Sequence, residues 1–222
     1  MIIAPSLLAS DYCRFGSEVI RADRSGAEWL HLDIMDGHFV PNLSFGPEVV
    51  RRIRPLTKMF FDVHLMCSKP EVVLEPFQKA GADLITIHVE LGHAVDSLIW
   101  KIRSLGKQVG LAVNPPTNIN AAIPFLAKID LLLVMTVNPG FGGQPFIAEM
   151  LPKIQQARRW RDEKGLKYRI EVDGGINQDT AKECAKAGAD TLVAGTALFS
   201  KRVMKTAVRQ MRDGATAAAR QG

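Results

Sequence analysis

The chain has 222 residues, of which 47% are hydrophobic, and a formal net charge of +5, so it can bury a full core as one α/β domain. No apolar run approaches the roughly 20 residues that span a bilayer, and the first residues lack the charged leader and cleavage site of a signal peptide. The three widely spaced cysteines fit neither a disulfide framework nor a metal spacing, so we expect reduced thiols, a cytoplasmic protein and no membrane partner.

Short runs of β-forming residues alternate with helical patterns along the whole chain. They predict eight strands: Ile2–Ser6, Trp29–Met35, Phe60–Met66, Leu84–Val89, Val109–Val113, Leu131–Val137, Arg169–Asp173 and Thr191–Ala194. Each intervening segment is long enough for one helix. Helix start signals occur at Ser10-Asp11, at Pro70-Glu71 and at Asn177-Gln178-Asp179.

A phrase of small residues, a glycine and an acid recurs where helices are expected to return to strands, at Ser25–Glu28, Ala80–Asp83 and Ala187–Asp190. Each glycine suits the left-handed position that ends a helix. Regular alternation of strand and helix requires a parallel sheet with right-handed crossovers. Eight such units predict one closed (β/α)8 barrel, the TIM-barrel fold, over residues 1–222. The alternative is an open doubly wound sheet, but no Gly-x-Gly-x-x-Gly turn follows the first strand.

Acids and histidines gather at the ends of three predicted strands. Side chains alternate along a strand, so His31 and Asp33 share one face, and His64 and Asp173 occupy similar places on two other strands. The carboxyl ends of barrel strands meet at one mouth. Two imidazoles and two carboxylates there predict a divalent metal site with coordination positions left for substrate.

Other polar residues on these strands receive weaker interpretations. Asp62 and Glu171 point the same way as the predicted ligands but lie deeper, so they either orient the ligands or are ordinary interior polar groups. His88 is interpreted as structural, and His38 and His93, in loops, are given no role.

Glycine-rich turns follow the last three predicted strands, at Asn138–Gln144, Gly174-Gly175 and Gly195-Thr196. Backbone N–H groups in such turns bind anions, and barrels commonly hold phosphate after strands seven and eight. We therefore expect a phosphorylated substrate.

Three methionines lie at or near strand ends: Met35, Met66 and Met135. They are either ordinary core residues or a polarizable wall that excludes water from a reaction intermediate.

Two opposed carboxylates beside a Lewis acid suit proton transfer next to a carbonyl. If Asp33 and Asp173 flank a ketose phosphate, one removes a carbon-bound proton and the other returns it from the opposite side, through a metal-stabilised enediolate. That reaction inverts one carbon.

The basic clusters Arg51–Arg54 and Arg158–Arg161 lack interleaved aromatic residues, so we expect solvated helix faces and no nucleic-acid partner.

Five stretches resemble the ribulose-phosphate 3-epimerase family between Ile3 and Phe199: Ala4–Ser6, His31–Asn42, Asp62–Met66, Asn138–Gln144 and Glu171–Gly175. The resemblance implies interconversion of D-ribulose 5-phosphate and D-xylulose 5-phosphate, in the pentose phosphate pathway or the Calvin cycle. It implies one ion per subunit, Zn or else Fe(II), Mn or Co, bound by His31, Asp33, His64 and Asp173. Asp33 would accept the proton of ribulose 5-phosphate and Asp173 would donate one.

The resemblance also implies substrate contacts from Ser6, His31 and His64, and a phosphate site formed by Gly142, Gly143, Gly174, Gly175, Gly195 and Thr196. The helix surfaces of a small barrel predict a homo-oligomer, a dimer or hexamer. A hexulose-phosphate 3-epimerase acting on D-allulose 6-phosphate is the nearest alternative, although the paired glycines favour the pentose enzyme. A barrel decarboxylase or aldol-type synthase would need a lysine that Asp33–Asp36 does not contain. A non-catalytic metal- or phosphate-binding barrel is the remaining alternative.

Overall fold

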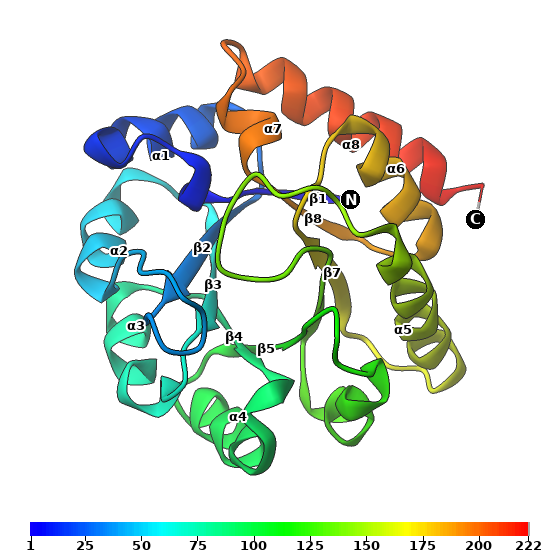
Figure 1. Cartoon of the computed structure of the whole chain (residues 1–222). Helices are drawn as coiled ribbons and strands as arrows, with labels where there is room; N and C mark the ends of the chain where they lie inside the picture. The colour runs from blue at the N-terminus through cyan, green and yellow to red at the C-terminus, as the bar shows by residue number, and fades with distance from the viewer. Residues whose placement is uncertain (222) are drawn as a thin grey trace.

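The eight predicted strands form one parallel sheet in the computed structural model, which describes residues 1–221. The strands are β1 (Ile2–Pro5), β2 (Trp29–Met35), β3 (Phe60–Met66), β4 (Leu84–His88), β5 (Gln108–Val113), β6 (Leu131–Met135), β7 (Arg169–Asp173) and β8 (Thr191–Ala194). Strands β2 to β8 pair in sequence order, and β1 pairs with β8. A parallel bridge between Ser6 and His31 joins β1 to β2, so the sheet closes into a barrel as predicted (Figure 1).

Helices surround this ring of strands in Figure 1. They are α1 (Phe15–Arg24), α2 (Pro47–Ile53), α3 (Leu74–Ala80), α4 (Val95–Ser104), α5 (Leu151–Glu163), α6 (Gln178–Ala187), α7 (Thr196–Phe199) and α8 (Met204–Ala219). One expected α-helix is missing from the described residues, because the segment between β5 and β6 forms 3-10 turns over Ile119–Lys128. Pro124 lies in the middle of that segment, where its ring and missing N–H oppose an α-helix.

Alternate strand side chains form two separate layers. Leu30, Leu32 and Ile34 of β2 pack outward in the main core between the strands and the helices. Inside the barrel, a smaller apolar cluster includes Leu131, Leu133 and Met135 of β6. His31, Asp33, Asp62, His64 and Glu171 belong to this interior layer near its carboxyl end, which explains why they are buried. The register of β2 and β3 aligns His31 with Asp62 and Asp33 with His64.

The recurring acid of the helix-to-strand phrase has a structural task at the opposite end of the barrel. An acid precedes each even-numbered strand, accepts a hydrogen bond from a backbone N–H of the preceding strand and pairs with an arginine. These four clamps are Glu28 with Ile3 and Arg212, Asp83 with Phe61 and Arg54, Asp130 with Val109 and Arg103, and Asp190 with Ile170 and Arg161. Two members of the basic clusters, Arg54 and Arg161, are therefore held in ion pairs on the barrel itself.

The glycines of this phrase also behave as predicted. Gly81 and Gly188 follow α3 and α6 with φ of 102° and 120°, a backbone conformation that favours glycine. Among residues 1–221, no helix has both the length and the apolar character required to cross a membrane. The three cysteines are free thiols, with Cys13 exposed and the other two buried.

Candidate active site

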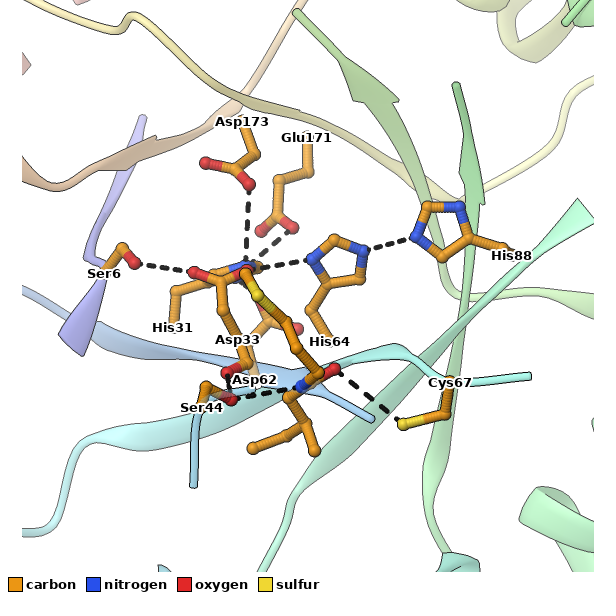
Figure 2. A network of polar contacts seen from close by, with 12 residues as sticks. Ser6, His31, Asp33, Ser44, Asp62, His64, Cys67, His88, Glu171 and Asp173 are labelled. Carbon is orange, nitrogen blue, oxygen red and sulfur yellow. Dashed lines mark hydrogen bonds and ion pairs between the residues drawn. The ribbon is translucent and has the colours of Figure 1, made fainter. Parts of the chain in front are cut away.

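Four predicted metal ligands from three strands meet at the carboxyl end of the barrel. Each offers one nitrogen or oxygen atom, and the four atoms all lie within 4.8 Å of one another: His31, Asp33, His64 and Asp173. One nitrogen of each imidazole contacts the same oxygen, Oδ1 of Asp33. His31 Nε2 lies 3.1 Å from this oxygen and His64 Nδ1 lies 3.0 Å from it. Figure 2 shows these side chains pointing toward one another, with Asp173 above His31 in the view and His64, followed by His88, to its right.

Asp33 is held from several sides. The Ser6 hydroxyl donates to its second oxygen at 2.7 Å, and Ser44 Oγ donates to its backbone carbonyl at 2.6 Å. Burial opposes ionisation of Asp33, but the imidazoles of His31 and His64 outweigh burial and hold its pKa well below the usual range. Asp33 is therefore an ionised carboxylate.

Asp173 experiences the opposite balance. Burial raises its pKa to about 7, and the negative charge of Asp33 adds to the effect. Its Oδ2 lies 4.0 Å from His31 Nε2, and the side chain retains 17% exposure. Two carboxyl groups in one site thus differ widely in proton affinity.

Asp62 orients His31 from below, as one of the two interpretations of that residue expected. Its Oδ2 lies 2.5 Å from His31 Nδ1, so a neutral His31 presents Nε2 to the ligand cluster. Burial alone would lower the pKa of His31, but the carboxylates of Asp33 and Asp62 raise it well above the usual value. A proton on His31 offsets part of the negative charge buried here.

Glu171 extends this acidic cluster deeper into the barrel. Its Oε1 lies 3.8 Å from His31 Nδ1, and neither of its oxygens has a hydrogen-bond partner among the described residues. Burial, followed by the charge of Asp62, raises the pKa of Glu171 well above its usual value. A buried carboxyl without partners is costly when ionised, which favours the protonated form.

A cavity of about 340 Å³ opens directly above these groups. All of the predicted site residues except His31 and His64 line it: Ser6, Asp33, Met35, Met66, Met135, Gly142, Gly143, Asp173, Gly174, Gly175, Gly195 and Thr196. His31 and His64 are fully buried beneath it and do not line it. Neither lysine nor arginine is among the lining residues, so an anion bound here would meet uncharged groups, either backbone N–H groups or polar side chains such as that of Thr196.

His88, interpreted from the sequence as structural, contacts one of the predicted ligands, which the sequence analysis did not anticipate. Its Nε2 lies 2.8 Å from His64 Nε2, and its Nδ1 lies 3.1 Å from Glu90 Oε2 (Figure 2). The only signal in the sequence was that His88 shares the inward parity of β4. His38 contacts only its own loop, where its Nδ1 lies 2.9 Å from the backbone oxygen of Asp36.

An eight-stranded (β/α)8 barrel with acids, imidazoles and a glycine-lined cavity at its carboxyl mouth has the architecture of a TIM-barrel enzyme. Residues 2–199 match the model of the ribulose-phosphate 3-epimerase family. The chain is 46% identical over 215 residues to the ribulose-phosphate 3-epimerase of Synechocystis, covering 96% of this chain and 94% of that protein. It is 43% identical over 211 residues to the Bacillus subtilis ribulose-phosphate 3-epimerase, covering 95% and 97%.

A solved structure of KGPDC from Streptococcus mutans in complex with D-R5P has the same fold, with a TM-score of 0.73. The match covers 97% of each chain at 16% identity. The chain belongs to the ribulose-phosphate 3-epimerase family. The predictions of an epimerase and of a TIM barrel are therefore confirmed.

Proposed function

We propose that this enzyme interconverts D-ribulose 5-phosphate and D-xylulose 5-phosphate by moving the C3 proton between Asp33 and Asp173, with one divalent cation held beside them. The observation that carries the proposal is the convergence, within 4.8 Å, of donor atoms from four side chains of β2, β3 and β7. Family membership supports the pentulose phosphates as substrates.

The residues present fit a cation. Ligand atoms at about 2.0–2.2 Å from a tetrahedral ion lie about 3.4 Å from one another. The distances from Asp33 Oδ1 to His31 Nε2 and to His64 Nδ1, 3.1 and 3.0 Å, are close to that value. Glu171, buried without hydrogen-bond partners, shows that the interior carries more acidic groups than its hydrogen bonds satisfy. Two nitrogens and two carboxylate oxygens suit zinc, and also Fe(II), Mn or Co. When bound, the cation would supply Lewis-acid stabilisation of the negative charge that develops on the substrate carbonyl oxygen.

The two carboxylates divide the proton transfer. Starting from ribulose 5-phosphate, Asp33 takes the proton as the C3–H bond breaks, and the electron pair moves toward C2 to give an enediolate. Asp173 then delivers a proton to the other face of C3, which inverts that carbon. The low pKa of Asp33 and the raised pKa of Asp173 support this assignment. Met35, Met66 and Met135 would cover the planar intermediate with apolar, polarizable atoms and exclude water.

The phosphate is assigned to the glycine-rich side of the cavity. Gly174, Gly175 and Gly195 lie there beside the short helix α7, which follows β8 directly. Loops after strands seven and eight with a short extra helix form the usual phosphate site of TIM barrels. Binding through backbone N–H groups agrees with a lining that has no cationic side chain.

The two-carboxylate mechanism is tested by exchange of the C3 proton with deuterated solvent. We expect Asp173→Asn to lower epimerisation by about 10²- to 10⁴-fold. It should still exchange the C3 proton of ribulose 5-phosphate, because Asp33 is intact, but not that of xylulose 5-phosphate. Asp33→Asn should give the reverse pattern. The metal content of each variant is measured alongside, because both residues are proposed ligands.

Two results would contradict the proposal. Near-normal epimerisation by Asp173→Asn would exclude its role as a proton carrier. Full activity in a preparation shown by elemental analysis to be free of divalent metal would exclude the cation. Parallel assays on D-allulose 6-phosphate would show whether hexulose phosphates are also substrates.

A further inference from the structure

A chain of three hydrogen-bonding side chains runs from the ligand cluster to the edge of the barrel. His64 Nε2 lies 2.8 Å from His88 Nε2, and His88 Nδ1 lies 3.1 Å from Glu90 Oε2. The backbone N–H of Asn114 donates to the other Glu90 oxygen, Oε1, at 2.8 Å. His64 and His88 are fully buried, so water does not offer either ring a competing partner.

A carboxylate lies at each end of this chain, Glu90 at one and Asp33 at the other, and each favours a different direction of the hydrogen bonds between them. A carboxylate only accepts, so the proton in the first link must lie on His88 Nδ1. A neutral imidazole carries one N–H, and His88 Nε2 is then an acceptor. When this link is kept, His64 donates from Nε2 and carries no proton on Nδ1. That Nδ1 lies 3.0 Å from Asp33 Oδ1, inside the ligand cluster, and the ionised Asp33 also only accepts, so Asp33 favours a proton on Nδ1 and competes with Glu90.

We propose that Glu90 and His88 are positioning residues that draw the proton of His64 to Nε2 against the competing acceptor Asp33, so that Nδ1 is free to bind the cation. The inference rests on the cation site of the proposed function. Asp62 orients His31 by a direct contact with its Nδ1. In the proposal Glu90 has the same task for His64, except that the imidazole of His88 lies between the carboxylate and the ligand.

Glu90→Gln is the most informative variant because it keeps the shape of the side chain and reverses the hydrogen bonds. The Asn114 N–H holds the amide oxygen, which turns the amide NH2 toward His88 Nδ1. His88 must then accept at Nδ1 and donate from Nε2. His64 would accept at Nε2 and carry its proton on Nδ1, where it blocks coordination.

The tautomer of His64 is measured by nitrogen-15 NMR of the metal-free protein, and the affinity for Zn and Co(II) by competition with a chelator. We expect Glu90→Gln to show only the Nδ1–H tautomer, which Asp33 also favours, and the wild type to show a larger share of the Nε2–H tautomer. The variant should bind both metals about 10- to 100-fold more weakly. Glu71→Gln, the same change at an exposed acid, should leave both readouts unchanged.

A double-mutant cycle separates this relay from a structural role of Glu90. His88→Phe removes the link between Glu90 and His64, so Glu90→Gln in that background should leave the affinity for Zn unchanged. His88→Phe alone should shift His64 toward the Nδ1–H tautomer, because Asp33 then has no competitor for the proton; this tests the relay even if Glu90→Gln does not fold.

An unchanged tautomer and affinity in Glu90→Gln, or a single Nε2–H tautomer of His64 in His88→Phe, would overturn the proposal. Failure of the wild type to bind Zn or Co(II) would instead refute the cation site of the proposed function. The tautomer measurement needs no metal, so the two failures are distinguishable.

Discussion

Cation binding at this site should depend steeply on pH, because the cation must displace protons from its ligands. Burial raises the pKa of Asp173 to about 7, so this carboxyl is mostly protonated below neutral pH and mostly ionised above it. The pKa of His31 is raised well above its usual value by Asp33 and Asp62. His31 therefore also holds a proton at neutral pH that coordination must remove.

The magnitude follows from these two groups. Each proton displaced costs a factor of ten in apparent affinity, about 1.4 kcal/mol, for each pH unit below the pKa of its group. Below pH 7, where both Asp173 and His31 are protonated, the two together should lower the affinity about 100-fold per unit. Just above pH 7, only His31 contributes, and the slope should fall to about tenfold per unit.

Chelator competition with Zn or Co(II) at a series of pH values from 6 to 8 measures the slope. Calorimetry in two buffers of different ionisation enthalpy counts the protons released. Asp173→Asn serves as the reference, because other titrating groups are common to both proteins and cancel in the difference. The variant should lose one unit of slope below pH 7. An equal slope in the two proteins would refute the assignment of a raised pKa to Asp173.

Two further predictions concern the stability of the barrel, read as the free energy of unfolding in denaturant. Gly175→Ala should cost more than about 2 kcal/mol, because φ is +66° and a Cβ would lie 2.5 Å from the backbone nitrogen of Phe146. Gly106→Ala is its control, because φ is +71° there and the added Cβ would meet no neighbouring atom within 4 Å. The control should cost only the backbone strain of about 1–2 kcal/mol. Asp83→Ala should cost about 1–3 kcal/mol by leaving a buried strand N–H unpaired, whereas Asp96→Ala, in an exposed ion pair, should cost less than about 1 kcal/mol.

The sequence predicted the barrel well because each strand carries its own signal. The bounds of the four strands β2, β3, β7 and β8 agree with the structure, and the others differ by one or two residues at one end. Alternation correctly separated inward His31 and Asp33 from outward Leu30 and Leu32. The missing α-helix before β6 was also marked in the sequence, by Pro124.

The stagger between strands could not be predicted, and it determines which side chains meet. His64 aligns with Thr86 in the register of β3 and β4, yet its ring reaches His88, two residues farther along. Barrel closure requires such a shear between neighbouring strands, and local patterns do not contain it. This is why the ligands were predicted from parity and strand ends, whereas the relay through His88 to Glu90 was not.

The same excess of buried acid accounts for both the binding and the chemistry of the site. Asp33, Asp62, Glu171 and Asp173 surround His31, and all of these acids except Asp173 are buried. Their mutual repulsion raises the pKa of Asp173 and Glu171, while the imidazoles lower that of Asp33. One cavity therefore holds an aspartate with a low pKa, Asp33, and an aspartate with a raised pKa, Asp173. The negative charge that contributes to the raised pKa of Asp173 is also the charge that a divalent cation would neutralise.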